Sequence, residues 1–227
     1  LAGGQGARAG FEVPKQLAML GGKPVLRWSI DAFAAHPAVS GGVLVAHADV
    51  MAATGALPTG WISADPGIER QQSVANALAV LADWADDALL LVHDAARPGV
   101  TAPVIDRLLA ALGNADAAIP TLPVPDTLVE QAQNEAGDVV DRDGLARVQT
   151  PQAFRLGALR RAHLETVDTA ATDDAQLVRR LGLAVAAVPG DARLHKLTYA
   201  ADMAILSGLL GIHAMKRTAV GMGYDVH

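Results

Sequence analysis

The chain has 227 residues, of which 51% are hydrophobic and 4% aromatic, and it carries a net charge of −6. This length suffices for one large α/β domain or two small ones, while the absence of cysteine excludes a disulfide scaffold and a zinc–thiolate site. The charge argues against nucleic-acid binding. No apolar run reaches the roughly 18 to 20 residues of a membrane span, and no signal-peptide pattern is present, so a cytoplasmic protein is expected.

Along the chain, short apolar runs alternate with amphipathic stretches, which is the pattern of an α/β fold. The apolar runs predict strands at residues 42–47, 61–64, 88–93, 115–120 and 184–188. Helical spacing of apolar residues predicts helices at residues 24–35, 73–84, 103–112, 172–181 and 200–210. The run at 88–93 is the strongest strand signal, and an acidic residue, Asp94, follows it directly.

Two regions interrupt this alternation. Residues 121–148 contain prolines and glycines around short β-prone pieces at 128–129 and 139–140, which predicts a hairpin-like excursion rather than a second domain. Residues 211–219 form a short polar connection with the character of a linker. The main domain is therefore expected to cover residues 1–210.

The chain opens on the glycine-rich segment LAGGQGAR at residues 1–8, and we expect a first strand to precede Leu1 in the intact protein. Closely spaced glycines let backbone N–H groups approach phosphate oxygens without interference from a Cβ atom. Arg8 adds a fork of donors that suits phosphate, and Lys15 adds a point charge. The alternative is a plain glycine-rich turn with solvated cations. No Gly-Lys-Ser/Thr follows as in a P-loop, and Pro14 and Lys15 interrupt the helix that a dinucleotide fingerprint requires.

Further motifs follow in a fixed order. They are AGGxGxR at 2–8, PKQ at 14–16, GxERxxSV at 67–74, HDAARP at 93–98, DT at 126–127, VDRxGL at 140–145, TPQ at 150–152, TDD at 172–174 and KxT at 196–198. Together, over residues 1–210, the chain resembles 2-C-methyl-D-erythritol 4-phosphate cytidylyltransferases. The resemblance implies a Rossmann-like nucleotidyltransferase fold with a mostly parallel sheet and a β-arm, at about 121–148, for dimerisation.

The activity implied is transfer of CMP from CTP, with Mg²⁺, to 2-C-methyl-D-erythritol 4-phosphate, with release of pyrophosphate. The attacking group is a phosphate that is already an anion, so the reaction needs positioning and charge neutralisation rather than a general base. By the resemblance, Arg8 and Lys15 would stabilise charge on the triphosphate in the transition state. Arg142 and Lys196 would hold the phosphate of the acceptor substrate.

The resemblance also assigns the binding positions. Those for the nucleotide would be Ala2, Gly3, Gly4, Gly6, Gly67, Ser73, Asp94 and Ala95. Those for the acceptor substrate would be Arg97, Thr127, Thr150 and Thr172. Asp94 ends the strongest strand, where open α/β sheets bind ligands, and is the candidate to hold Mg²⁺ or a substrate hydroxyl.

Simpler structural roles stand beside these assignments. Ser73 is also a preferred residue for capping the helix predicted to begin there, and Asp94 could cap a helix instead of meeting a ligand. Arg97 could face a partner subunit, and His93 is expected to be packed rather than catalytic.

In the family that the chain resembles, the arm reaches across a homodimer and completes the neighbouring site, so Thr127 and Arg142 would serve the partner. The chain departs from the family's frequent residues at several positions. These positions are Ile68, Pro125, Val129 and Leu194.

The last residues, GMGYDVH at 221–227, resemble the first motif of 2-C-methyl-D-erythritol 2,4-cyclodiphosphate synthases. Asp225 and His227 are two positions apart on a predicted strand, so both would point to one side and bind a divalent metal, usually zinc. Residues 220–227 would then begin the second enzyme of a fusion protein, which would form a higher assembly. The family's remaining histidine ligand would lie beyond His227.

Three alternatives remain. A ribitol 5-phosphate cytidylyltransferase would share the fold and the chemistry, but the AA pair at 95–96 and the tail favour the methylerythritol substrate. A sugar-nucleotide or molybdopterin nucleotidyltransferase would share the first loop, but not the motifs at 140–145 and 196–198. A nucleotide-binding regulatory module would have kept the loop and lost the catalytic cations.

Overall fold

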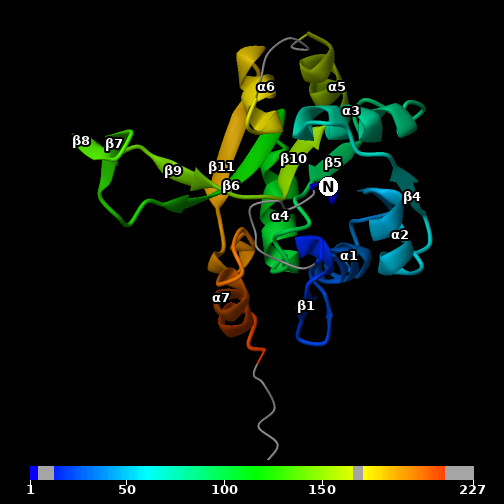
Figure 1. Ribbon diagram of the computed structural model, residues 1–227. Coiled ribbons are helices and arrows are strands. Elements are labelled where there is room, and N and C mark those ends of the chain that lie inside the picture. Colours follow the sequence, from blue (N-terminus) through cyan, green and yellow to red (C-terminus); the bar gives the residue numbers. More distant parts are fainter. Residues whose placement is uncertain (5–12, 166–170, 213–227) are drawn as a thin grey trace, which may run out of the picture.

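The computed structural model describes residues 1–4, 13–165 and 171–212 and has an α/β architecture (Figure 1). Its main sheet contains β11 (Val185–Pro189), β6 (Ala117–Pro123), β10 (Gln152–Arg155) and β5 (Leu89–Val92) in this order, with β9 (Ala146–Val148) paired to β6. β6 and β11 are parallel, and β10 is antiparallel to both β5 and β6. β5, β6 and β11 therefore share one direction. The parallel strands β3 (Gly42–Val45) and β4 (Trp61–Ala64) form a separate pair.

The predicted α/β class with mostly parallel strands is confirmed, and each strand predicted from an apolar run is present with its ends shifted by a few residues. The same holds for the predicted helices, which are α1 (Val25–Ala34), α3 (Arg70–Val80), α4 (Ala102–Ala111), α6 (Asp174–Arg180) and α7 (Asp202–Leu209). Sequence patterns missed β10, β9 and the small hairpin β1 (Met19–Leu20) and β2 (Lys23–Pro24). They also missed α2 (Ala48–Thr54), α5 (Leu156–Glu165) and the short 3-10 helices η1 (Lys15–Leu17) and η2 (Ala192–Leu194).

The core lies on both faces of the main sheet, because neighbouring residues of a strand point to opposite sides. Ala117, Ile119 and Phe154 pack on one face with apolar residues of α3, α5 and α6. Ala118 and Ala153 point to the other face and pack against α4. Small alanine side chains at these fully buried positions let the helices approach the sheet closely.

The excursion predicted at 121–148 is confirmed as a hairpin of β7 (Leu128–Ala132) and β8 (Glu135–Val140), which projects from the body of the molecule (Figure 1). Leu128 pairs with Val140 and Val129 with Val139, which are the two β-prone pieces of the sequence. Val129 and Val139 are exposed. Whether the hairpin forms a dimer stays a prediction.

The first residues of the chain join the two sheets at the ends of their strands. The amide of Ala2 donates to the carbonyl of Val45, the last residue of β3, at 2.7 Å. Leu1 pairs with the segment that follows β5, because its nitrogen donates to the carbonyl of His93 and its carbonyl accepts from the amide of Ala95. The glycine-rich segment therefore starts at the carboxyl ends of β3 and β5. Among the described helices, none is long and apolar enough to cross a membrane.

Candidate active site

A cavity of about 190 Å³ lies where the glycine-rich segment, η1, the start of α3 and the segment after β5 meet. Its lining includes many residues expected to bind nucleotide or phosphate. These are Ala2, Gly3, Gly4, Lys15, Gly67, Ser73, Asp94, Ala95 and Lys196. A larger cavity of about 570 Å³ lies between β3 and β5, but its described lining is mostly apolar and contains no carboxylate, lysine or arginine. The charged cavity is the better candidate for chemistry on phosphates.

Gln16 holds the glycine-rich segment in place through two hydrogen bonds. Its side chain is buried, and Nε2 donates to the carbonyl of Ala2 at 2.8 Å and to that of Gly4 at 3.2 Å. A Cβ atom on Gly3 would lie 2.3 Å from Cβ of Pro66, so this close approach requires glycine. The adjacent Lys15 reaches the cavity from the same 3-10 helix. The sequence interpretation gave Gln16 no role, although its motif PKQ had drawn attention to the neighbouring lysine.

Two cations hold the carboxylate of Asp94, one at each oxygen. Nζ of Lys196 lies 2.8 Å from Oδ2, and Nε of Arg70 lies 3.5 Å from Oδ1. Burial alone would raise the pKa of Asp94, but the positive charges of Lys196 and Arg70 outweigh it and hold this pKa well below its ordinary value. Asp94 therefore stays ionised at the edge of the cavity.

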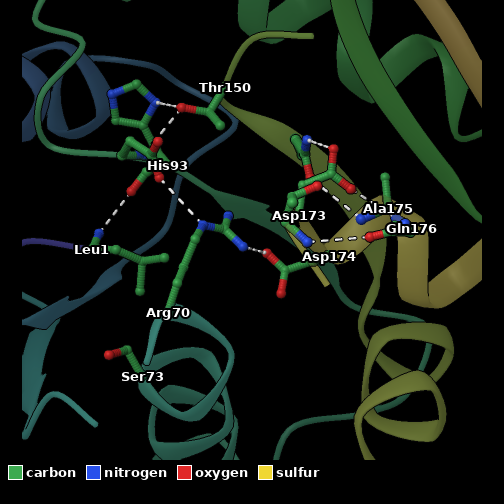
Figure 2. Close-up of polar contacts among 12 residues, drawn as sticks. Leu1, Arg70, Ser73, His93, Thr150, Asp173, Asp174, Ala175 and Gln176 are labelled. Carbon is green, nitrogen blue, oxygen red and sulfur yellow. Dashed lines mark hydrogen bonds and ion pairs between the residues drawn. The ribbon is translucent and has the colours of Figure 1, made fainter. Parts of the chain in front are cut away.

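Arg70 continues this charge arrangement away from the cavity (Figure 2). Its Nη1 donates to Oδ2 of Asp174 at 2.6 Å, and Nε2 of His163 lies 3.0 Å from Oδ1 of the same carboxylate. Asp174 is the first residue of α6 and its side chain is only 1% exposed. Sequence reasoning gave these residues no role. The signal was present, because Arg70 lies in the motif GxERxxSV and Asp174 in TDD.

Thr150 supports the backbone of Asp94 and contacts His93, and Figure 2 shows the contact between the Thr150 and His93 side chains. The Thr150 hydroxyl accepts from the Asp94 amide at 3.1 Å and lies 3.2 Å from Nδ1 of His93. Burial lowers the pKa of His93 to about 3, so the ring is neutral. The threonine hydroxyl then donates to Nδ1, and Nε2–H donates to the carbonyl of Arg97 at 3.0 Å. This agrees with the expected structural role of His93, and it turns the Thr150 hydroxyl away from the cavity.

Ser73 shapes the turn that precedes α3. Its buried hydroxyl accepts from the amide of Gly67 at 3.0 Å and donates to the carbonyl of Glu69 at 3.1 Å. The alternative that Ser73 caps the helix is wrong, because α3 begins at Arg70 and Ser73 lies within its first turn. Contact of Ser73 with a nucleotide base stays a prediction.

Arg97 holds the segment that delivers Lys196. Its Nη1 donates to the carbonyl of Leu194 at 2.6 Å, and the amide of Leu197 donates to the carbonyl of Ala96 at 2.8 Å. Burial lowers the pKa of Arg97. These bonds tie the segment after β5 to the segment around η2, and so they bring Lys196 to Asp94.

Other predicted site residues lie elsewhere. Thr127 and Arg142 are exposed on the arm, where Arg142 donates to the carbonyl of Pro125. Thr172 is exposed just before α6 and does not line the cavity of the described structure. Four predicted residues lie outside the described part of the chain: Gly6, Arg8, Asp225 and His227.

The described residues offer one carboxylate at the cavity for a metal that arrives with a nucleotide. No group of three or more histidine, cysteine or acidic side chains within residues 1–4, 13–165 and 171–212 is placed to hold a metal alone. Asp94 is ionised and lines the cavity. Mg²⁺ commonly binds through one or two carboxylates together with substrate phosphates and water, so this donor set fits such an ion.

Comparison with known proteins identifies the family. The sequence model of IspD, 2-C-methyl-D-erythritol 4-phosphate cytidylyltransferase, matches residues 1–211. A protein of Sphingopyxis alaskensis named bifunctional enzyme IspD/IspF is 74% identical over the whole chain, which spans 58% of that relative's length.

Solved structures agree. The Thermus thermophilus 2-C-methyl-D-erythritol 4-phosphate cytidylyltransferase has a TM-score of 0.75 and 36% identity, and the match covers 88% of this chain and 95% of that one. The Francisella tularensis enzyme of the same name has a TM-score of 0.80 and 25% identity, with 92% and 96% covered. The chain belongs to the 2-C-methyl-D-erythritol 4-phosphate cytidylyltransferase family.

Proposed function

We propose that this domain transfers CMP from CTP to 2-C-methyl-D-erythritol 4-phosphate, giving 4-diphosphocytidyl-2-C-methyl-D-erythritol and pyrophosphate. One observation carries the proposal beyond family membership. Lys15 and Lys196, from opposite ends of the sequence, line one cavity with the backbone of Gly3 and Gly4. Such a cavity can bring two phosphate groups together, because two ammonium groups at one cavity offset the repulsion between the phosphates.

The chemistry follows from these positions. An oxygen of the acceptor's phosphate attacks the α-phosphorus of CTP in line, the bond from that phosphorus to the bridging oxygen breaks, and pyrophosphate leaves with both electrons of that bond. Lys15 would neutralise charge that grows on the triphosphate, together with Arg8. Lys196 would hold the attacking phosphate, which needs no general base because it is already ionised.

Mg²⁺, when bound with CTP, would neutralise triphosphate charge, with Asp94 as its carboxylate from the protein. Asp94 also keeps Lys196 at the cavity. His93 and Thr150 hold the Asp94 backbone in turn, so we propose that Thr150 acts on the acceptor substrate through Asp94. Thr172 would contact the acceptor substrate only after a rearrangement of the segment before α6.

The arm accounts for the residues that stand apart from the cavity. Thr127 and Arg142 are exposed on a projecting hairpin, where they can meet a second copy of the chain. We therefore propose a homodimer in which each arm supplies Arg142 to the partner's acceptor phosphate. A shared site of this kind explains why Arg142, which is expected to be catalytic, lies away from Lys15 and Lys196.

The longer protein is proposed to carry a second activity. The Sphingopyxis alaskensis relative is named as bifunctional, and this chain spans 58% of its length. We propose that Asp225 and His227 begin a zinc site of a 2-C-methyl-D-erythritol 2,4-cyclodiphosphate synthase in the same polypeptide.

Pyrophosphate release from CTP and Mg²⁺ tests the main proposal, with either 2-C-methyl-D-erythritol 4-phosphate or ribitol 5-phosphate as the acceptor. Turnover with the methylerythritol compound is expected. Turnover with ribitol 5-phosphate alone would instead identify the related cytidylyltransferase. Nucleotide binding without turnover of either acceptor would identify a regulatory module.

A further inference from the structure

Behind the cavity, a row of four charged side chains and a histidine runs from the site into the body of the domain. Its order is Lys196, Asp94, Arg70, Asp174 and His163, and each contact is at most 3.5 Å long. The residues come from separate parts of the fold. Arg70 starts α3, Asp94 follows β5, Asp174 starts α6 and His163 lies on α5. Arg70 stands in the middle of the row, with a carboxylate on either side (Figure 2).

Arg70 contacts Asp174, on the side away from the cavity, more closely than it contacts Asp94 at the cavity. Its contact with Asp174 measures 2.6 Å, whereas its contact with Asp94 measures 3.5 Å. Burial would lower the pKa of Arg70, but Asp174 and Asp94 together raise it above its ordinary value. The guanidinium is therefore a fixed cation, which Asp174 holds and which presents Nε to the site.

Asp174 is itself held firmly. Its second oxygen lies 3.0 Å from Nε2 of His163. The preceding residue, Asp173, caps α6 by accepting from the amide of Gln176 at 2.8 Å, and Gln152 donates to Asp173 at 3.3 Å. Since the side chain of Asp174 is 1% exposed, water cannot replace Arg70 as its partner without opening the core.

We infer that Arg70 is a positioning residue for the acceptor substrate. It occupies one oxygen of Asp94, so that Lys196 is held by the other oxygen alone. An ammonium group has three N–H donors, and two of them then remain for the acceptor's phosphate. Without Arg70, both oxygens of Asp94 would be free to bind Lys196, and the lysine would be drawn away from the phosphate. This inference rests on the proposed function of Lys196.

Kinetics of Arg70→Met and Arg70→Lys test the inference, with Arg160→Met as the matched control. Arg160 likewise forms an ion pair with an aspartate, Asp86, at 2.6 Å, but it does not line the cavity. Because a displacement of about 1 Å at a reacting group can cost about 100-fold, Arg70→Met should raise the KM for the acceptor about 10-fold or more. The KM for CTP should change less than about 3-fold, and Arg70→Lys should restore part of the loss.

A purely structural role predicts a different result. Loss of folded enzyme in Arg70→Met would lower kcat and the melting temperature while leaving both KM values at their wild-type levels, and this result would overturn the inference. Asp174→Asn, which keeps the shape but removes the charge that anchors Arg70, should also raise the acceptor KM. A wild-type acceptor KM in Asp174→Asn would show that Asp174 does not anchor Arg70.

Crystal structures of the wild type and Arg70→Lys separate this inference from the proposed function. In Arg70→Lys, one ammonium group replaces the guanidinium that contacts both Asp174 and Asp94. The Oδ1 atom of Asp94, which Arg70 contacts in the wild type, should then turn toward Lys196. An unchanged Asp94–Lys196 contact in the variant would contradict the inference about Arg70. This outcome does not depend on whether the wild type turns over either acceptor. Absence of turnover in the wild type would count against the proposed function alone.

Discussion

The ammonium of Lys196 lies 2.8 Å from Oδ2 of Asp94, although 102 residues separate the two in the sequence. The side chain of Lys196 is 43% exposed and that of Asp94 is 14% exposed, so the pair sits at the wall of the cavity rather than in the core. Ion pairs at the surface contribute little to stability, and the lysine of this pair is exposed. The main consequence of the Lys196–Asp94 pair is to fix where the Lys196 ammonium group meets a substrate phosphate.

Lys196→Met should therefore remove activity with little loss of stability. We expect the rate of pyrophosphate release to fall by about 10²–10³-fold, as for the loss of one donor to a developing negative charge. The melting temperature should fall by less than about 4 °C, which corresponds to about 1 kcal/mol for a domain of this size. Lys23→Met is the control, because Lys23 pairs with Asp31 at 2.7 Å and does not line the cavity. A rate unchanged in Lys196→Met would contradict the role given to this residue.

Gln16→Glu should weaken nucleotide binding. The variant carboxylate would face two carbonyl oxygens in a buried place where Gln16 now donates to both. Loss of these bonds and the repulsion should destabilise the fold by about 1–3 kcal/mol and raise the KM for CTP. Gln131→Glu, on the exposed hairpin, makes the same chemical change without these neighbours. Equal KM values for CTP in the two variants would show that Gln16 does not shape the glycine-rich segment.

His93 should make the fold less stable in acid. Its pKa is lowered from 6.5 to about 3 in the folded protein, mainly by burial, so below pH 6.5 the unfolded chain binds a proton that the folded chain does not. The free energy of unfolding should therefore fall by about 1.4 kcal/mol per pH unit from this residue as the pH drops from 6.5 toward 3. Urea unfolding of His93→Gln should show a shallower dependence over this range, with His47→Gln as the control. Equal slopes for His93→Gln and the wild type would refute the assignment.

Mixing two inactive variants tests the shared site of the proposed homodimer. Lys15→Ala should abolish turnover with a nearly unchanged melting temperature, and Arg142→Ala should lose most turnover. If each site takes Lys15 from one chain and Arg142 from the other, half of the dimers in an equal mixture are mixed, and each of these has one intact site. The mixture should then regain about a quarter of wild-type activity after subunit exchange. No recovery from a mixture shown to contain mixed dimers would place Arg142 in its own chain's site.

The alternation of apolar runs and amphipathic stretches predicted the fold class, and the prolines, glycines and β-prone pieces that interrupt it predicted the hairpin at 121–148. These features are local, since each depends on the spacing of residues within one segment. The same local signal located Asp94 correctly at the end of β5. β10 was missed because it is short, and its place between β5 and β6 depends on partners far away in the sequence.

Motif order pointed to Lys15, Asp94 and Lys196, but tertiary structure decided what each residue touches. Arg70 and Asp174 are 104 residues apart, and only the packing of α3 beside the start of α6 joins them. The direction of the Thr150 hydroxyl likewise depends on where the fold places His93 and the amide of Asp94. Local spacing determines which face of a helix or strand is apolar. A buried charge requires a partner, and that partner can come from a distant part of the sequence. Which residue it is therefore depends on which elements pack together.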